Sequence, residues 1–192
     1  VVGGLTHQKG GPSVLDVAER LHAAGSPARF GVTGKSAADL EAEAKQRPNI
    51  DLLGFVPDAD LPALYRSADA LYFPSHYEGF GLPVVEALAS GLPVVCSDHP
   101  AVLEAGPRAV LRAPAAAAGF SAASLGRLLA DPSFRQHWRD QALSVRPGLG
   151  WEPVAARLLD ALHTFGREPR VRAATRPRPP QHSSPSAAKT TS

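Results

Sequence analysis

The sequence ALYFPSHYEGFGLPVVEALASGLPVVC, residues 70–96, has the pattern of a strand, a loop, a helix and a second strand. Residues 70–73 and 93–96 are short and almost wholly apolar, as strands covered on both faces are. Pro83 marks the start of a helix over 83–90, because proline suits the first helical position. A strand, a crossover helix and a second strand predict a parallel pair with a right-handed connection.

The same alternation continues on both sides of this stretch. Further strands are expected at 1–2, 29–33, 50–53 and 109–111, and further helices at 13–24, 36–46, 60–67, 121–130, 132–145 and 152–165. The pattern predicts an α/β fold, a doubly wound parallel sheet of the Rossmann-like kind, followed by helices and a disordered tail. Ligands of such sheets bind beyond the carboxyl ends of the strands. We therefore expect the functional site in the loops that follow residues 2, 33, 53, 73 and 96.

Composition indicates a globular protein and narrows its setting. The chain has 192 residues, of which 44% are hydrophobic and 20% charged, which excludes wholesale disorder. Its one cysteine, Cys96, cannot form an intramolecular disulfide and favours a reducing compartment, so we predict a cytoplasmic location. Methionine is absent even at position 1, and residues 1–4 resemble the end of a buried strand. These features predict a fragment of a longer protein.

The charge is uneven along the chain. The net charge is +2, yet residues 167–192 hold six basic side chains against one acidic side chain, so residues 1–166 are slightly acidic. The same segment contains five prolines and one large apolar residue, too few apolar groups to offset the entropy of ordering it. We predict a folded domain over 1–166 and a disordered basic tail over 167–192, with no nucleic-acid partner. A polyanion-binding arm is the alternative for the tail.

Gly34, Lys35 and Ser36 form half of a phosphate-binding P-loop. The full motif needs a glycine five residues before Gly34, where this chain has Arg29. The alternative is a strand end followed by a turn glycine and a serine that caps the next helix.

Two other groups of residues suggest metal binding, and for both we favour a structural interpretation. Asp58 and Asp60 resemble paired metal-binding carboxylates, but they stand where a helix begins, and the helix dipole favours acids there. His7, His76 and His99 fall on three separate loops, and none has a second ligand at metal spacing. No metal is predicted.

The loop at residues 74–87 carries the strongest functional signal. Gly79 and Gly81 allow backbone amides to approach a ligand closely, and the helix that follows directs its free N–H groups to the same place. A phosphate fits such a position. Glu78 and Glu86, with seven residues between them, would repel phosphate and are better placed to accept hydrogen bonds from hydroxyls. Phosphate and many hydroxyls together indicate a sugar nucleotide, and a solvated surface loop is the alternative.

The block from Glu78 to Glu86 resembles the signature of retaining glycosyltransferase family 4, the group 1 glycosyltransferases, which have the GT-B fold of two Rossmann-like domains. Other segments follow the same family pattern, and the resemblance covers residues 1 to about 165: Val2–Leu5 with Lys9–Gly10, Leu53–Val56, Leu61–Asp69, Pro74–Ser75, Ala89–Ser97, and Trp151 with Ala155 and Leu158. It implies the C-terminal, donor-binding half of a hexosyltransferase, which uses a nucleoside-diphosphate sugar and retains the configuration. It implies no metal or other cofactor, and an acceptor-binding N-terminal domain outside this chain.

The resemblance assigns roles to single residues. Lys9 would contact the donor diphosphate and stabilise charge on the leaving group, and Glu78 would bind a hydroxyl of the sugar; these two are the predicted catalytic residues. Glu86 would accept hydrogen bonds from the ribose hydroxyls. The remaining donor-binding positions are Gly3 and Gly4 at the strand end, Phe80, Gly81 and Leu82 through their backbone, and Val56 and Asp58 at the base. Trp151 is expected to pack at the start of the last helix.

Gly4 departs from the family pattern, which usually has an arginine there. Leaving-group stabilisation would then depend on Lys9 and the helix N-terminus. An arginine at this position should raise turnover, unless the glycine has a positive φ angle. Two alternatives stay open: a non-catalytic or truncated sugar-nucleotide-binding module, and a doubly wound interaction domain without a ligand. The sequence predicts neither the acceptor, the base, the sugar nor membrane association.

Overall fold

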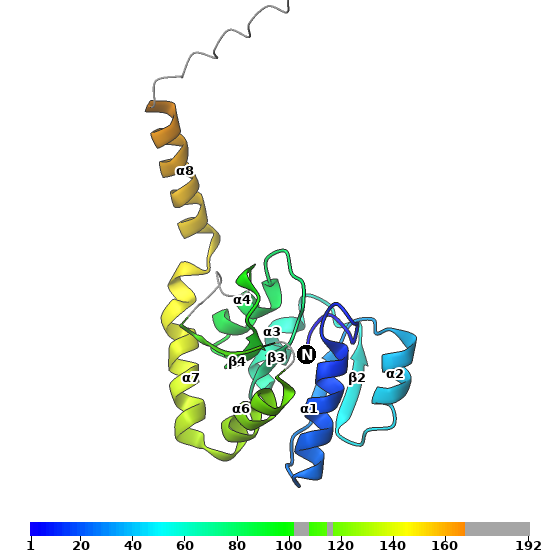
Figure 1. The fold of residues 1–192 in the computed structure, drawn as a ribbon. Helices are drawn as coiled ribbons and strands as arrows, with labels where there is room; N and C mark the ends of the chain where they lie inside the picture. The colour runs from blue at the N-terminus through cyan, green and yellow to red at the C-terminus, as the bar shows by residue number, and fades with distance from the viewer. Residues whose placement is uncertain (102–107, 115–116, 168–192) are drawn as a thin grey trace, which may run out of the picture. The chain divides into compact units, whose positions relative to one another are not determined.

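A computed structural model describes residues 1–101, 108–114 and 117–167 of the chain. Helices and short strands alternate through most of it, as the sequence predicts (Figure 1). The elements are α1 Gly11–Ala23, β1 Phe30–Thr33, α2 Ala38–Ala44, β2 Ile50–Gly54, α3 Leu61–Ser67, β3 Leu71–Phe73, α4 Leu82–Ala89, β4 Val94–Ser97, β5 Val110–Ala113, α6 Ala118–Ala130, α7 Pro132–Val145, the 3-10 helix η1 Arg146–Gly148 and α8 Trp151–Arg167.

Every strand pairing in the described ranges is parallel. β1 pairs with β2, and β4 pairs with β3 on one side and β5 on the other. Residues 1–2 join the first pair through a parallel bridge between Val2 and Thr33. The expected single sheet is therefore hydrogen-bonded as two groups.

A cavity of about 560 Å³ borders residues 1–2, the start of β1 and the start of β3, at the amino ends of the strands.

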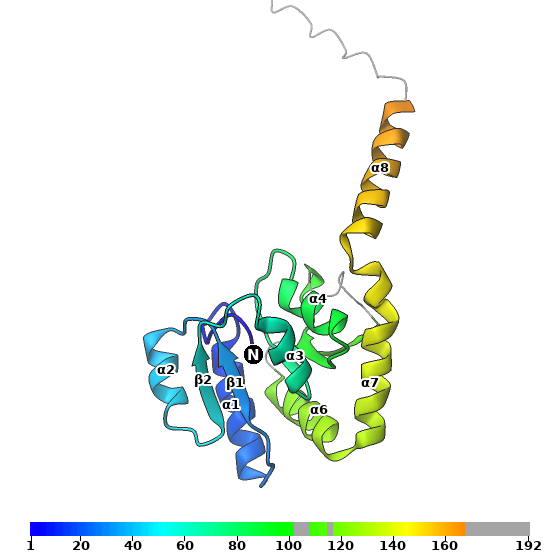
Figure 2. The ribbon, with the colours of Figure 1, turned by 180° about the vertical axis from the view of Figure 1, so that it is seen from behind.

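Alternate residues of the central strands enter two separate cores. Tyr72 of β3 and Val95 of β4 pack with α1, α2 and α6, whereas Phe73 and Cys96 pack with α3 and α4 on the other face. Successive side chains of a strand point to opposite faces, so both faces of the sheet are covered. Figure 2 shows α2 and β2 at one side of the domain and α7 at the other. This arrangement confirms the predicted doubly wound α/β fold.

Two helix starts differ from the prediction. Ser13 does not begin α1, because Gly10 occupies the N-cap in a left-handed conformation (φ 71°) and the helix starts at Gly11. Ser36 does not cap α2, because its hydroxyl accepts a hydrogen bond from the Leu5 N–H at 3.0 Å. The start of α1 depends on the left-handed conformation of a glycine, which no local pattern specifies. The start of α2 depends on a contact between two loops that are distant in sequence.

The paired acids lie just outside the helix. Asp60 is the N-cap of α3 and makes no side-chain cap bond, and Asp58 precedes it. Neither acid therefore lies in the first turn of the helix, where the sequence analysis expected them.

The chain divides into two compact units, Val1–Ala155 and Ala156–Ser192. The predicted boundary between a domain over 1–166 and a tail over 167–192 stays a prediction, because residues 168–192 lie outside the described residues. Trp151 is 87% exposed, so the expected packing of this side chain is wrong. No helix in the described ranges combines the length and the apolar character needed to cross a membrane.

Candidate functional site at the carboxyl ends of the strands

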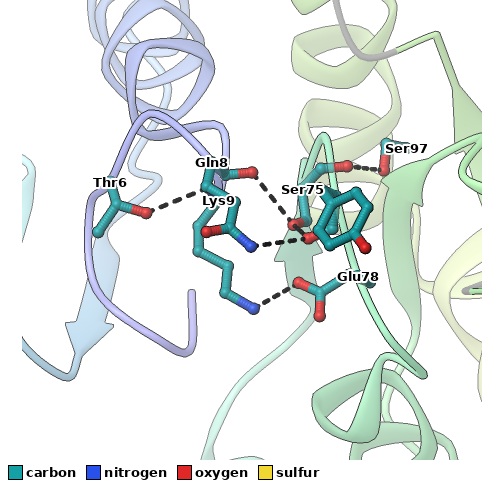
Figure 3. Close-up of polar contacts among 7 residues, drawn as sticks. Thr6, Gln8, Lys9, Ser75, Glu78 and Ser97 are labelled. Carbon is teal, nitrogen blue, oxygen red and sulfur yellow. Dashed lines mark hydrogen bonds and ion pairs between the residues drawn. The ribbon is translucent and has the colours of Figure 1, made fainter.

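Hydrogen bonds connect two loops at the carboxyl ends of the strands. Residues 3–10 follow the bridged residue Val2, and residues 74–81 follow β3. The His76 N–H donates to the Gln8 carbonyl at 2.9 Å, and the Gln8 side-chain amide lies 3.5 Å from the Tyr77 carbonyl. The structure thus brings together two loops that are almost 70 residues apart in the sequence (Figure 3).

Lys9 and Glu78 meet across these loops. The Lys9 ammonium lies 2.5 Å from Glu78 Oε1. Figure 3 shows this contact between the two loops. The lysine side chain is 28% exposed and that of Glu78 only 8%. The ammonium also lies 5.7 Å from the centre of the Phe73 ring at the end of β3. Both predicted catalytic residues therefore lie side by side, and the lysine side chain is partly exposed.

Two buried serines fix the loop after β3. The fully buried Ser75 has its hydroxyl within hydrogen-bond distance of the carbonyls of Gln8 (3.3 Å) and Tyr77 (3.1 Å). Ser97, at the end of β4, donates to the Ser75 carbonyl. The sequence analysis did not assign a role to either serine. Ser75 lies two residues after β3 and Ser97 is the last residue of β4, and this position at strand ends was the available signal.

The N-terminus of α4 opens at the same end of the sheet. Gly81 is its N-cap in a left-handed conformation (φ 80°), which places the first turn of the helix immediately after the glycine loop. Within the described ranges, the N–H groups of Gly81 and Leu82 have no protein acceptor. The side chains of Phe80 and Leu82 are exposed, whereas Gly81 between them is buried. Free N–H groups and the helix dipole make this position suitable for an anion.

Glu86 lies one turn into α4 and is exposed. Its Oε2 accepts a hydrogen bond of 2.7 Å from the hydroxyl of Tyr65 on α3. Burial raises the pKa of the Tyr65 phenol far above its ordinary value, and the hydrogen bond to Glu86 raises that pKa further. The phenol is therefore a permanent donor. The sequence analysis treated Tyr65 as part of a matching segment and missed this contact.

The remaining predicted residues lie on adjacent loops. Val56 is partly buried and Asp58 exposed, and both belong to the connection between β2 and α3. Gly3 is exposed and Gly4 buried, with φ angles of 102° and 79°. A Cβ atom on Gly4 would lie 2.0 Å from the Lys35 carbonyl oxygen. The positive φ angle and this contact block the gain expected from an arginine at Gly4.

Two of the histidines that suggest metal ligands contact other side chains in the structure. His7 Nε2 lies 3.1 Å from Asp39, and this hydrogen bond lowers the pKa of the Asp39 carboxyl. The His99 ring meets the Tyr77 ring edge-on, with centroids 6.1 Å apart. Across the ranges that the structure describes, no group of three or more histidine, cysteine, aspartate or glutamate side chains could hold a metal ion. The 560 Å³ cavity lies at the other end of the strands, and Lys9, Glu78 and Glu86 do not line it, although the Tyr65 ring does.

Solved structures with the same fold include an α,α-trehalose-phosphate synthase (UDP-forming) from Burkholderia vietnamiensis. It matches with a TM-score of 0.72 and 19% sequence identity, over 86% of this chain and 44% of the synthase. The pneumococcal O-GlcNAc transferase GtfA, solved in complex with UDP and GlcNAc, matches with a TM-score of 0.70 and 17% identity, over 87% of this chain and 36% of the transferase. These likenesses confirm the Rossmann-like fold of a GT-B domain.

Sequence relatives point to the same family. The chain is 38% identical over 112 residues to O-antigen chain mannosyltransferase B of Escherichia coli, which covers 58% of this chain and 29% of that protein. It is 33% identical over 164 residues to glycogen synthase of Mycobacterium tuberculosis, over 80% of this chain and 39% of the synthase. The chain thus spans well under half the length of these relatives. A family model described as glycosyl transferases group 1 matches residues 1–144, so the chain belongs to this family of glycosyltransferases.

Proposed function

We propose that this chain is the donor-binding half of a glycosyltransferase that moves a hexose from a nucleoside-diphosphate sugar to an acceptor with retention of configuration. One observation carries the proposal: the Lys9 ammonium and the N-terminus of α4 lie at the same sheet end as the carboxylates of Glu78 and Glu86. A ligand that satisfies both kinds of group has an anionic part and several hydroxyls. A nucleoside-diphosphate sugar has both.

Lys9 has the central chemical role in this proposal. Negative charge grows on the diphosphate as its bond to the sugar breaks, and a fixed ammonium stabilises that charge more in the transition state than in the ground state. The contact with Glu78 holds the ammonium between the two loops before the ligand arrives. Glu78 Oε2 is then the atom that would accept a hydrogen bond from a sugar hydroxyl, while Oε1 keeps the lysine in place.

We propose that the reaction needs no metal or other cofactor, because Lys9 and the free N–H groups of α4 supply the positive potential that a metal would supply. A cytoplasmic location also belongs to the proposal. It rests on Cys96, a buried thiol in a chain that has no second cysteine. The acceptor would be bound by a further, N-terminal domain, and no nucleic-acid partner is proposed.

A sugar-nucleotide-binding module without turnover is the second candidate. It is favoured by Gly4, which occupies the position where the family usually has an arginine and has no space for one. The two candidates agree on nucleotide binding and differ only in turnover. Transfer or slow hydrolysis of a panel of donor sugars by the whole protein separates them, because the module would release no free sugar above the uncatalysed rate.

Calorimetric titration tests the binding that both candidates share. UDP, GDP and ADP are titrated into the chain and into the Glu86→Ala and Lys9→Ala variants. Loss of a charged acceptor of ribose hydroxyls should weaken the tightest of these ligands about tenfold to a hundredfold, and loss of the ammonium should also weaken it. Lys45→Ala is the matched control, because Lys45 lies at the end of α2 in an exposed ion pair with Glu41. Equal affinity in all four proteins would overturn the proposed site.

A further inference from the structure

We infer that Tyr65 is a positioning residue, which holds the Glu86 carboxylate where it can accept hydrogen bonds from the ribose of the donor. The inference rests on the proposed function, because it assigns Glu86 to ribose. It adds a residue from a different helix that does not itself touch the ligand.

The position of the Tyr65 hydroxyl is fixed by the core. Tyr65 is 4% exposed, and its ring packs in the core formed with Val84, Leu88 and Phe73 on one face of the sheet. Only the hydroxyl reaches beyond this core, where it donates to Glu86 Oε2 at 2.7 Å. A ring packed in this core cannot readily follow the carboxylate if the carboxylate moves. The hydroxyl is therefore a fixed point to which an otherwise exposed side chain is tied.

The Tyr65 phenol remains a hydrogen-bond donor. Burial raises the pKa of this phenol, and the hydrogen bond to Glu86 raises it further, so the hydroxyl stays protonated. The hydrogen bond occupies one lone pair of Oε2 and leaves Oε1 free for the ligand. Glu86 is thus held on one oxygen by the protein and offers the other to solvent.

Preorganisation gives this contact its effect on binding. An exposed glutamate has several rotamers, and selecting one of them at the moment of binding costs conformational entropy. Tyr65 selects the rotamer before the ligand arrives. Removing only its hydroxyl should therefore weaken the ribose contact about threefold to tenfold, less than removal of the carboxylate itself.

The test is calorimetric titration of this chain with two matched probes. One probe is whichever of UDP, GDP and ADP binds the wild type most tightly, and the other is its 2′,3′-dideoxy counterpart. The variants are Tyr65→Phe, Glu86→Ala and the double variant. Tyr72→Phe is the control, because Tyr72 is an equally buried phenol that packs on the opposite face of the sheet and bonds Ser13 at 3.4 Å. Thermal melts verify that every variant is folded.

We expect Tyr65→Phe to weaken the ribose probe about threefold to tenfold and to leave the dideoxy probe unchanged. The double variant should bind as Glu86→Ala does, and Tyr72→Phe should bind as the wild type does. Full affinity in Tyr65→Phe together with reduced affinity in Glu86→Ala would overturn this inference and leave the proposed function standing. Equal weakening of both probes by Tyr65→Phe would show a merely structural role. A wild type that binds neither probe, or binds both equally, would overturn the assignment of Glu86 to ribose itself.

Discussion

Gly4 is the position at which a single added methyl group should damage the loop that carries Lys9. Its φ angle is 79°, and a Cβ atom there would meet the Lys35 carbonyl oxygen at 2.0 Å and the Lys35 carbonyl carbon at 2.6 Å. These atoms are backbone and cannot rotate away as a side chain would. The Gly4 N–H also donates to the Thr33 carbonyl at 2.6 Å, which holds the glycine against the turn.

The cost of Gly4→Ala has two parts. A left-handed conformation costs a residue with a Cβ atom roughly 1–2 kcal/mol. Relief of the contact with Lys35 requires a backbone shift, and overpacking of this kind typically costs about 1–3 kcal/mol. Gly25 separates the two parts, because its φ angle is 69° and a Cβ atom there would have no neighbour within 4 Å. Gly25→Ala therefore carries only the conformational cost.

Thermal denaturation followed by circular dichroism measures the difference. Gly4→Ala should melt below Gly25→Ala by roughly 2–12 °C, because each kcal/mol shifts the midpoint by about 2–4 °C in a chain of this size. The smaller entropy of an unfolded chain with alanine affects both variants equally and cancels. If Gly4→Ala melts at or above Gly25→Ala, the close approach to Lys35 is wrong. The longer variant Gly4→Arg should fail to raise turnover for the same steric reason.

Three further predictions concern other parts of the chain. Deletion of residues 168–192 should leave the melting temperature and nucleotide affinity nearly unchanged, and a fall of several degrees would show that this segment packs on the domain. The Asp131 carboxylate caps α7 by accepting a hydrogen bond from the Phe134 N–H at 2.9 Å, and this bond is the main reason that the pKa of Asp131 is lowered. The cap therefore stabilises the fold fully above the unfolded pKa near 4, and this stabilisation is lost as the pH falls through the lower folded pKa. Asp131→Ala should melt a few degrees lower than the wild type at pH 7, and this difference should shrink in acid. Burial raises the pKa of the Cys96 thiol to about 12, so the folded chain at pH 8 should resist a thiol-labelling disulfide reagent that reacts fully once the chain is unfolded; rapid labelling of the folded chain would contradict the burial.

The alternation of elements could be predicted because each strand and helix carries its own local pattern. Residues 70–96 specify a strand, a loop, a helix and a strand, and the structure has all four. The starts of α1 and α2 could not be predicted in the same way. Gly10 approaches the Pro74 carbonyl so closely that a Cβ atom would lie 2.1 Å from it, and Ser36 turns to Leu5. Contacts over such sequence distances are set by the tertiary fold.

The candidate site was predictable in its location but not in its contacts. The rule that ligands bind beyond the carboxyl ends of parallel strands places Lys9 and Glu78 at one edge of the sheet. Their direct pairing depends on the paths of two loops, which Ser75 and Ser97 fix through hydrogen bonds to backbone carbonyls. The role of Tyr65 was missed because its ring fits the apolar pattern of a helix, and that pattern does not show which group its hydroxyl contacts.

An amide-resolved NMR titration of the chain with its tightest nucleoside diphosphate tests the central claim, that the carboxyl ends of the strands form the donor site. We predict the largest shifts at the backbone amides of residues 80–86 and 8–10, in the loops that hold Lys9 and the N-terminus of α4. The amides of residues 29–31 and 69–71, which line the 560 Å³ cavity at the other end of the strands, should stay unchanged. Shifts that gather around that cavity, or that spare residues 80–86 at saturation, would contradict the account.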